Sequence, residues 1–153
     1  MSEKLEKLKA KNAEKKLLER FHFLEIQEIQ NANDENGEKF FAEFRNSGIW
    51  NYENQPLATF PFHNENGLID RNLVKMQHQK ARVFFIEKIK KLSADFVWIA
   101  LSENDFYFFV KVSLSRLCNH LDTWFEKYFD FEVFIPNQYA LALHDAEYEW
   151  EVL

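Results

Sequence analysis

Residues 96–128, FVWIALSENDFYFFVKVSLSRLCNHLDTWFEKY, decide the fold class of this chain. Phe96–Leu101 and Phe106–Val112 are short aromatic and aliphatic runs on either side of Ser-Glu-Asn-Asp, which is typical of a β-hairpin. The hydrophobic period then changes from strand-like to helical. One helix face is indicated by the spacing of Leu114, Leu117, Cys118, Leu121, Trp124, Phe125 and Tyr128. The sequence therefore predicts a hairpin followed directly by a helix that begins at Ser113.

The C-terminal end is strand-like again. Phe131–Ile135 and Tyr139–Leu143 flank the turn residues Pro136-Asn-Gln, and Glu147–Val152 alternates between acidic and apolar side chains. His144-Asp145-Ala146 between the last two runs is predicted to be a turn. Together with the hairpin, these runs predict an antiparallel sheet of four to five strands crossed by one helix.

The first part of the chain is mainly helical in pattern. Residues 2–21 are rich in Lys, Glu, Leu and Ala and predict a charged helix, with Ser2 as its cap. A short helix is predicted at Glu38–Arg45 and a longer one at Asp70–Leu92. The apolar run Phe21–Ile29 fits either a helix or a strand. Residues 49–67 are expected to be an irregular connector, with room for a short strand around 57–62.

These patterns predict an α+β fold with N-terminal helices followed by the antiparallel sheet. Residues 1–20 are expected to be a charged helix that can protrude, and residues 21–153 a single α+β domain. The composition of 17 Phe, 4 Trp and 5 Tyr in 153 residues is enough for a sizeable aromatic core. A hydrophobic content of 46% excludes wholesale disorder.

Cysteine content and hydropathy bear on the compartment. Cys118 is the one cysteine, so an internal disulfide and a multi-cysteine zinc site are excluded. The first twenty residues lack the apolar run of a signal peptide, and the chain has no apolar stretch of about 18–20 residues that could span a bilayer. A cytoplasmic protein that does not partner a membrane is therefore expected.

Charge is concentrated toward the C-terminal end. The whole chain has a formal charge of −6, but residues 97–153 carry three cations, Lys111, Arg116 and Lys127, against ten carboxylates. A negative field of this kind repels nucleic acid and attracts a basic partner. The sequence therefore predicts a protein-binding function and no nucleic-acid partner.

The alternating segment near the C-terminal end is the main candidate for the binding surface. Glu147, Glu149 and Glu151 would point the same way, about 6.6 Å apart. Such a row is either a solvated, charge-guarded sheet face or a set of acceptors for Lys and Arg of a partner. The partner-binding residues predicted on the second interpretation are Asp130, Glu132, Asp145, Glu147, Glu149 and Glu151.

Signals for catalysis, a metal ion or a cofactor are weak. The five histidines form no paired metal-binding spacing, and the three glycines form no phosphate-binding loop, so no metal or cofactor is predicted. Arg71 and His78 match a short spacing known from helical ribonucleases, which is common by chance. Cys118 lies on an apolar helix face and is expected to be inert. An enzyme that uses His120 with a nearby acid stays open as an alternative.

Three segments of the chain have the general pattern of a known protein class but no specific motif of it. They are the hairpin Phe96–Leu101 with Phe106–Val112, the helix through Trp124, and the end FEVFIPNQYALALHDAEYEWEV. Over residues 90–153 the chain resembles the immunity proteins of bacterial polymorphic toxin and contact-dependent growth inhibition systems. That resemblance implies a small, acidic, non-catalytic protein that neutralises one cognate toxin domain, often a basic nuclease. It transfers no functional residue to this sequence.

The sequence thus leads to the hypothesis of a stoichiometric binding protein that occludes a basic toxin domain through its acidic surface. The rival hypotheses are a small enzyme with a His/carboxylate site and a helical assembly subunit joined through residues 2–21. A homodimer stays open as well.

Overall fold

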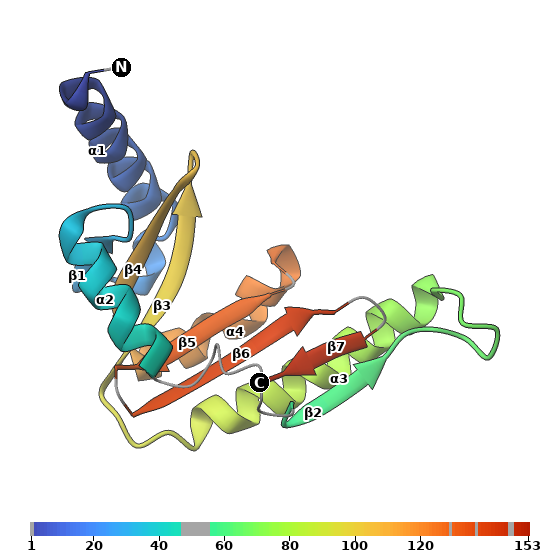
Figure 1. The fold of residues 1–153 in the computed structure, drawn as a ribbon. Coiled ribbons are helices and arrows are strands. Elements are labelled where there is room, and N and C mark those ends of the chain that lie inside the picture. The colour runs from blue at the N-terminus through green and yellow to red at the C-terminus, as the bar shows by residue number, and fades with distance from the viewer. Residues whose placement is uncertain (1, 47–55, 129, 137, 147–148) are drawn as a thin grey trace.

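The computed structural model describes residues 2–46, 56–128, 130–136, 138–146 and 149–153. Over these residues the chain forms four α-helices, one 3₁₀ turn and a seven-stranded antiparallel sheet (Figure 1). The helices are α1 (Glu3–Arg20), α2 (Glu35–Asn46), α3 (Arg71–Lys90) and α4 (Leu114–Lys127), with the 3₁₀ turn η1 at His22–Leu24. The strands are β1 (Glu28–Asn31), β2 (Ala58–Pro61), β3 (Phe96–Glu103), β4 (Phe106–Ser113), β5 (Phe131–Ile135), β6 (Tyr139–Asp145) and β7 (Glu149–Val152).

The predicted α+β class is confirmed, but the predicted number of strands is wrong. The sheet has the order β1-β4-β3-β5-β6-β7-β2, so the two extra strands lie at its edges. Both are four residues long and come from the mainly helical part of the chain. β2 falls within the short strand allowed around 57–62, and β1 overlaps the segment that fits either a helix or a strand. Neither is counted in the predicted sheet, because their pairing with β7 and β4 is decided by contacts distant in the sequence.

The structure resolves one open segment and corrects one prediction. Phe21–Ile29, left open between helix and strand, contains both: η1 ends at Leu24, the next residue Glu25 has a left-handed φ of 50°, and β1 begins at Glu28. The turn predicted at His144-Asp145-Ala146 is wrong for its first two residues. β6 continues to Asp145, and His144 pairs with Glu151 of β7. The part of the last run at residues 147–148 lies outside the described residues.

The predicted hairpin and its following helix are confirmed. β3 and β4 pair along their whole length and are joined by Asn104 and Asp105, whose φ angles of 49° and 67° fit a type I′ turn. The side chain of Ser113 then accepts a hydrogen bond from the Arg116 N–H and caps α4. Asp70 caps α3 in the same way. No helix of the described residues is long and apolar enough to cross a bilayer.

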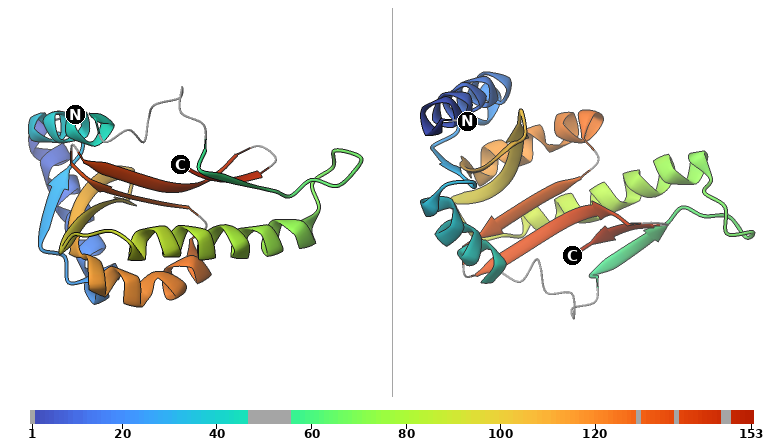
Figure 2. Two further views of the ribbon diagram at one scale, coloured as in Figure 1. Left: turned by 90° about the horizontal axis from the view of Figure 1, so that it is seen from below. Right: turned by 45° about the horizontal axis from the view of Figure 1, so that its top comes forward.

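The two faces of the sheet are covered differently (Figure 2). α3 and α4 lie against one face, which we call the helix face, and the end of α1 with η1 completes the same core. Its fully buried side chains include Leu17, Phe85, Ile99 and Leu141. α2 lies on the opposite face, which we call the α2 face, where a second and smaller cluster is built on Phe109, Phe134 and Ala142.

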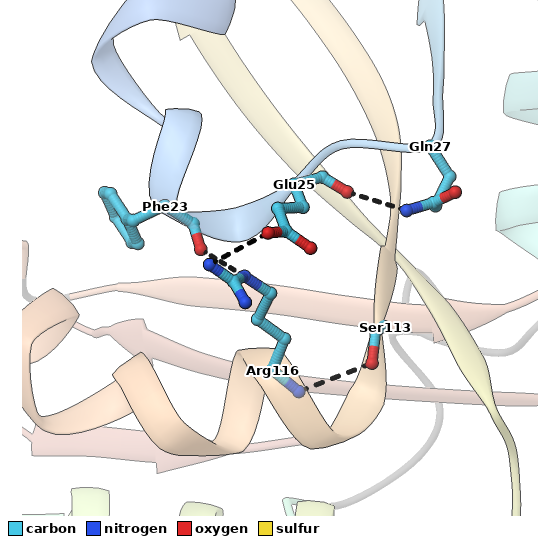
Figure 3. Close-up of polar contacts among 5 residues, drawn as sticks. All are labelled: Phe23, Glu25, Gln27, Ser113 and Arg116. Atoms are coloured by element: carbon cyan, nitrogen blue, oxygen red, sulfur yellow. Dashed lines mark hydrogen bonds and ion pairs between the residues drawn. The ribbon is translucent and has the colours of Figure 1, made fainter.

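The guanidinium group of Arg116 on α4 binds the segment that follows α1 (Figure 3). Arg116 Nε donates a hydrogen bond to the Phe23 carbonyl oxygen at 2.6 Å, and its Nη2 lies 3.2 Å from Glu25 Oε1. Gln27 Nε2 donates to the Glu25 carbonyl oxygen in the same segment. These bonds satisfy backbone groups of an irregular segment and hold it at the start of β1.

Candidate partner-binding surface

Four polar side chains of β5, β6 and β7 share the α2 face, and we call them the acidic cluster: Glu132, His144, Glu149 and Glu151. Their sequence neighbours Val133, Leu143 and Trp150 are buried in the core of the helix face. Because side chains alternate along a strand, the cluster residues must point to the other side. The ladder places His144 directly opposite Glu151, and Glu132 opposite Ala142.

His144 and Glu132 form a direct pair within this cluster. Nε2 of His144 lies 2.8 Å from Oε1 of Glu132, and the two side chains are only 25% and 22% exposed. The hydrogen bond to Glu132 raises the pKa of His144, against the opposing effect of burial, and the charges of Glu132, Asp130 and Glu151 raise it further. The imidazolium form is therefore favoured in the fold.

The two glutamates of β7, Glu149 and Glu151, are neighbours on the same face and interact unfavourably when both are ionised. Partial burial raises the pKa of Glu151, and the neighbouring charge and hydrogen bond of Glu149 raise it further, while His144 lowers it. In the part of the chain that the structure describes, the ion pairs of Lys and Arg side chains involve other carboxylates, and none involves Glu132, Glu149 or Glu151. His144 acts on two of the three carboxylates: it is bonded to Glu132, and its charge lowers the pKa of Glu151.

The structure brings together only part of the predicted binding set. Asp130 is exposed and precedes β5, close enough to raise the pKa of His144. Asp145 is also exposed, but it follows His144 and so points toward the helix face, away from Glu149 and Glu151. Glu147 lies outside the described residues.

His144 is the functional candidate that the sequence analysis missed. The turn predicted at His144-Asp145-Ala146 conceals its position opposite Glu151 on a strand. A signal in the sequence could have identified this position. Leu141 and Leu143 point to one face of the strand, so extending the alternation by one residue puts His144 on the opposite face.

A cleft of about 520 Å³ opens next to the cluster, where β3 and β5 separate. The two strands pair only at Trp98↔Phe134 and Ile99↔Val133, although β3 runs on to Glu103 and β5 starts at Phe131. Figures 1 and 2 show the β3–β4 hairpin diverging from β5 beyond this point. The cleft is lined by aromatic side chains and, on the β5 side, by Asp130 and Glu132.

The residues considered for catalysis lie elsewhere and apart from one another. His120 is half-buried on α4 and contacts Phe23, with the ring centroids 5.1 Å apart. His78 is buried in the core, 4.6 Å from the Trp150 ring. Burial raises the pKa of the Cys118 thiol, which opposes formation of a thiolate. The described residues hold no group of three or more His, Cys, Asp and Glu side chains that could bind a metal ion.

Comparison of the chain with protein-family models, with curated proteins and with solved structures gives no match. The functional argument therefore depends on the geometry and charge of this surface.

Proposed function

We propose that the chain is a stoichiometric binding protein that occludes a basic protein partner with the acidic cluster on the α2 face. The resemblance to immunity proteins makes a cognate toxin domain, in particular a nuclease, the best candidate partner. The observation that carries the proposal is the placement of Glu132, Glu149 and Glu151 on one sheet face, with no ion pair to a lysine or arginine among the described residues.

The charge distribution supports a binding role over a solvated surface. The other described glutamates near strands are balanced by cations: Glu103 lies 2.9 Å from Arg20, and Glu25 lies 3.2 Å from Arg116. Glu151, in contrast, sits beside Glu149 and is partly desolvated, so its charge costs the fold free energy. A basic surface placed over the cluster would relieve this repulsion and would be attracted before contact.

The His144–Glu132 pair is the specific observation that favours an enzyme as the second candidate function. A histidine held by a carboxylate at the margin of a cleft is the arrangement that general acid–base catalysis uses. The proposal for an enzyme then concerns His144 with Glu132 and no longer His120, which lacks a carboxylate contact among the described interactions.

The proposal predicts that a gene next to that of this chain encodes a large secreted protein with a basic C-terminal domain, and the experiment uses that domain as the partner. Stopped-flow association with that domain at low salt is measured for the unmodified chain and for the double variant Glu149→Lys/Glu151→Lys. We expect the association rate to fall about tenfold or more, with a smaller change in dissociation rate. Asp122→Lys/Glu126→Lys on α4 introduces the same charge change at exposed positions away from the cluster and serves as the matched control.

Equal loss of rate in both double variants would mean that only net charge matters and would contradict the proposed surface. Failure of the unmodified chain to bind the domain, or to protect cells that express it, would contradict the proposed function itself. Turnover of the domain or of a small molecule that is lost in His144→Gln would favour the enzyme.

A further inference from the structure

The separation of β3 and β5 leaves two strand edges inside the sheet without ladder partners. We call this region the β3–β5 wedge; its sides are Ala100–Glu103 and Phe131–Glu132. In the described part of both strands, ladder pairing ends at Ile99↔Val133. An interior opening of this kind differs from an outer edge because it has walls on both faces of the sheet.

The direction of the backbone groups follows from one hydrogen bond. Arg20 Nη2 donates to the Ser102 carbonyl oxygen at 2.7 Å, so this carbonyl points away from β4 and into the wedge. Since backbone groups of alternate residues point to the same side of a strand, the N–H and C=O of Ala100 point there too. Trp98, two residues before Ala100 in this series, uses that side to pair with β5.

The two walls of the wedge have different chemistry. Phe21, Trp124 and Phe131 line it on the helix face, and all three belong to the aromatic core. Glu132 lies on the α2 face, and Asp130 precedes it at the mouth. Arg20 also lines the cleft, but its charge is already matched by Glu103 at 2.9 Å. The wedge is therefore aromatic on the helix-face wall and mixed on the α2-face wall, where Phe41, Tyr107 and Phe109 lie beside the two carboxylates of the β5 side.

We infer that the β3–β5 wedge binds an extended polypeptide segment with alternating basic and apolar side chains, added as a strand to the edge of β3 that faces β5, where it would replace the Arg20 contact at the Ser102 carbonyl. An added strand presents alternate side chains to opposite faces. Apolar side chains would then enter the aromatic wall, and Lys or Arg side chains would reach Asp130 and Glu132. The inference rests on the proposed function, because it assigns the segment to the basic partner.

The probe is a terminally blocked octapeptide of alternating lysine and valine. Its binding is followed by amide chemical shifts and hydrogen exchange of the full chain, with two further peptides as controls: the glutamate–valine analogue and the lysine–valine peptide N-methylated at alternate residues. We expect saturable one-to-one binding of the first peptide, slowed exchange at the Ala100 and Ser102 amides, and no binding of either control.

Two variants test the position of the site. Ser102 is exposed and lines the cleft, so Ser102→Trp obstructs the wedge without removing buried atoms, and we expect loss of binding. Asp130→Asn should weaken binding about threefold, as expected for one partly exposed ion pair. Ser115→Trp, at an exposed position of α4, is the control for a new surface tryptophan. Unchanged thermal unfolding shows that each variant is folded.

The inference is overturned if the N-methylated peptide binds equally well, if Ser102→Trp binds normally, or if shifts occur only around Glu149 and Glu151. A result in which the peptide binds in the wedge but no basic protein domain binds the chain contradicts the proposed function alone. A protein complex that depends on Glu149 and Glu151 but tolerates Ser102→Trp overturns the wedge and leaves the proposed function standing.

Discussion

The helix face and the α2 face of the same sheet differ in how fully they are covered and in the charge they carry. The helix face packs Phe85, Ile99 and Leu141 at zero exposure between the sheet and the helical layer of α3, α4 and the end of α1 with η1. The α2 face has one helix over β3, β4 and β5, and beyond it the acidic cluster holds three carboxylates and one histidine. Hydrophobic burial on one face supplies the stability that lets the other keep charges that repel each other.

The largest loss of stability is expected from a substitution in the core of the helix face. Phe85→Ala removes a fully buried ring that meets Phe125 and Phe131 edge to face. We expect a loss of about 3–5 kcal/mol in the free energy of unfolding, because the cavity cannot collapse between a helix and the sheet. Urea unfolding measures it. A loss below about 1 kcal/mol would contradict the proposed difference between the faces.

An intermediate effect is expected where α2 covers the sheet. The half-buried Phe40 ring lies 4.4 Å from that of Trp98 and 5.2 Å from that of Phe109. Phe40→Ala should lower the free energy of unfolding by about 2 kcal/mol, less than the Phe85 variant because this cluster is smaller and partly solvated. Unfolding followed by tryptophan fluorescence tests the order of the two variants, and the reverse order would refute it.

The His144–Glu132 pair should make stability depend on pH. The pKa of His144 is raised above its ordinary value of 6.5 in the fold, so the pair stabilises the protein fully below about pH 6.5 and the contribution is lost as the pH rises through the raised pKa. Glu132→Gln should reduce the difference in unfolding free energy between pH 5.5 and pH 8.5 by about 1 kcal/mol. Asp122→Asn, which removes an exposed carboxylate, is the control and should preserve that difference.

The smallest change in stability is expected at the two neighbouring carboxylates of β7. Partial burial and the charge of Glu149 raise the pKa of Glu151, which means that its ionised form is disfavoured in the fold. Glu151→Gln should therefore stabilise the chain slightly at pH 7, by up to about 0.5 kcal/mol, while Glu126→Gln on α4 should not. Matched thermal unfolding curves decide this, and destabilisation by Glu151→Gln would show that the carboxylate has a structural role.

The sequence was informative wherever one element could be recognised from its own period. The long runs behind α3, α4, β3 and β4 predicted those elements nearly to the residue. A short strand was allowed at the position of β2, but the sequence could not show that β1 and β2 complete the two edges of the sheet, because that depends on pairing with β4 and β7. The same limit applies to the site: charge indicated Glu132, Glu149 and Glu151, but only the cross-strand register brings His144 to them.

The tight turn at Asn104 and Asp105 has a consequence for the order of folding. It connects two fully paired strands, and hairpins with such turns form within microseconds, so β3 and β4 are suited to nucleate the domain. β2 has to find β7 across most of the chain, pairing Ala58 with Val152, and that closure has a larger entropic cost. The strand carrying Glu149 and Glu151 therefore gains its second neighbour late, after the aromatic interior has already condensed.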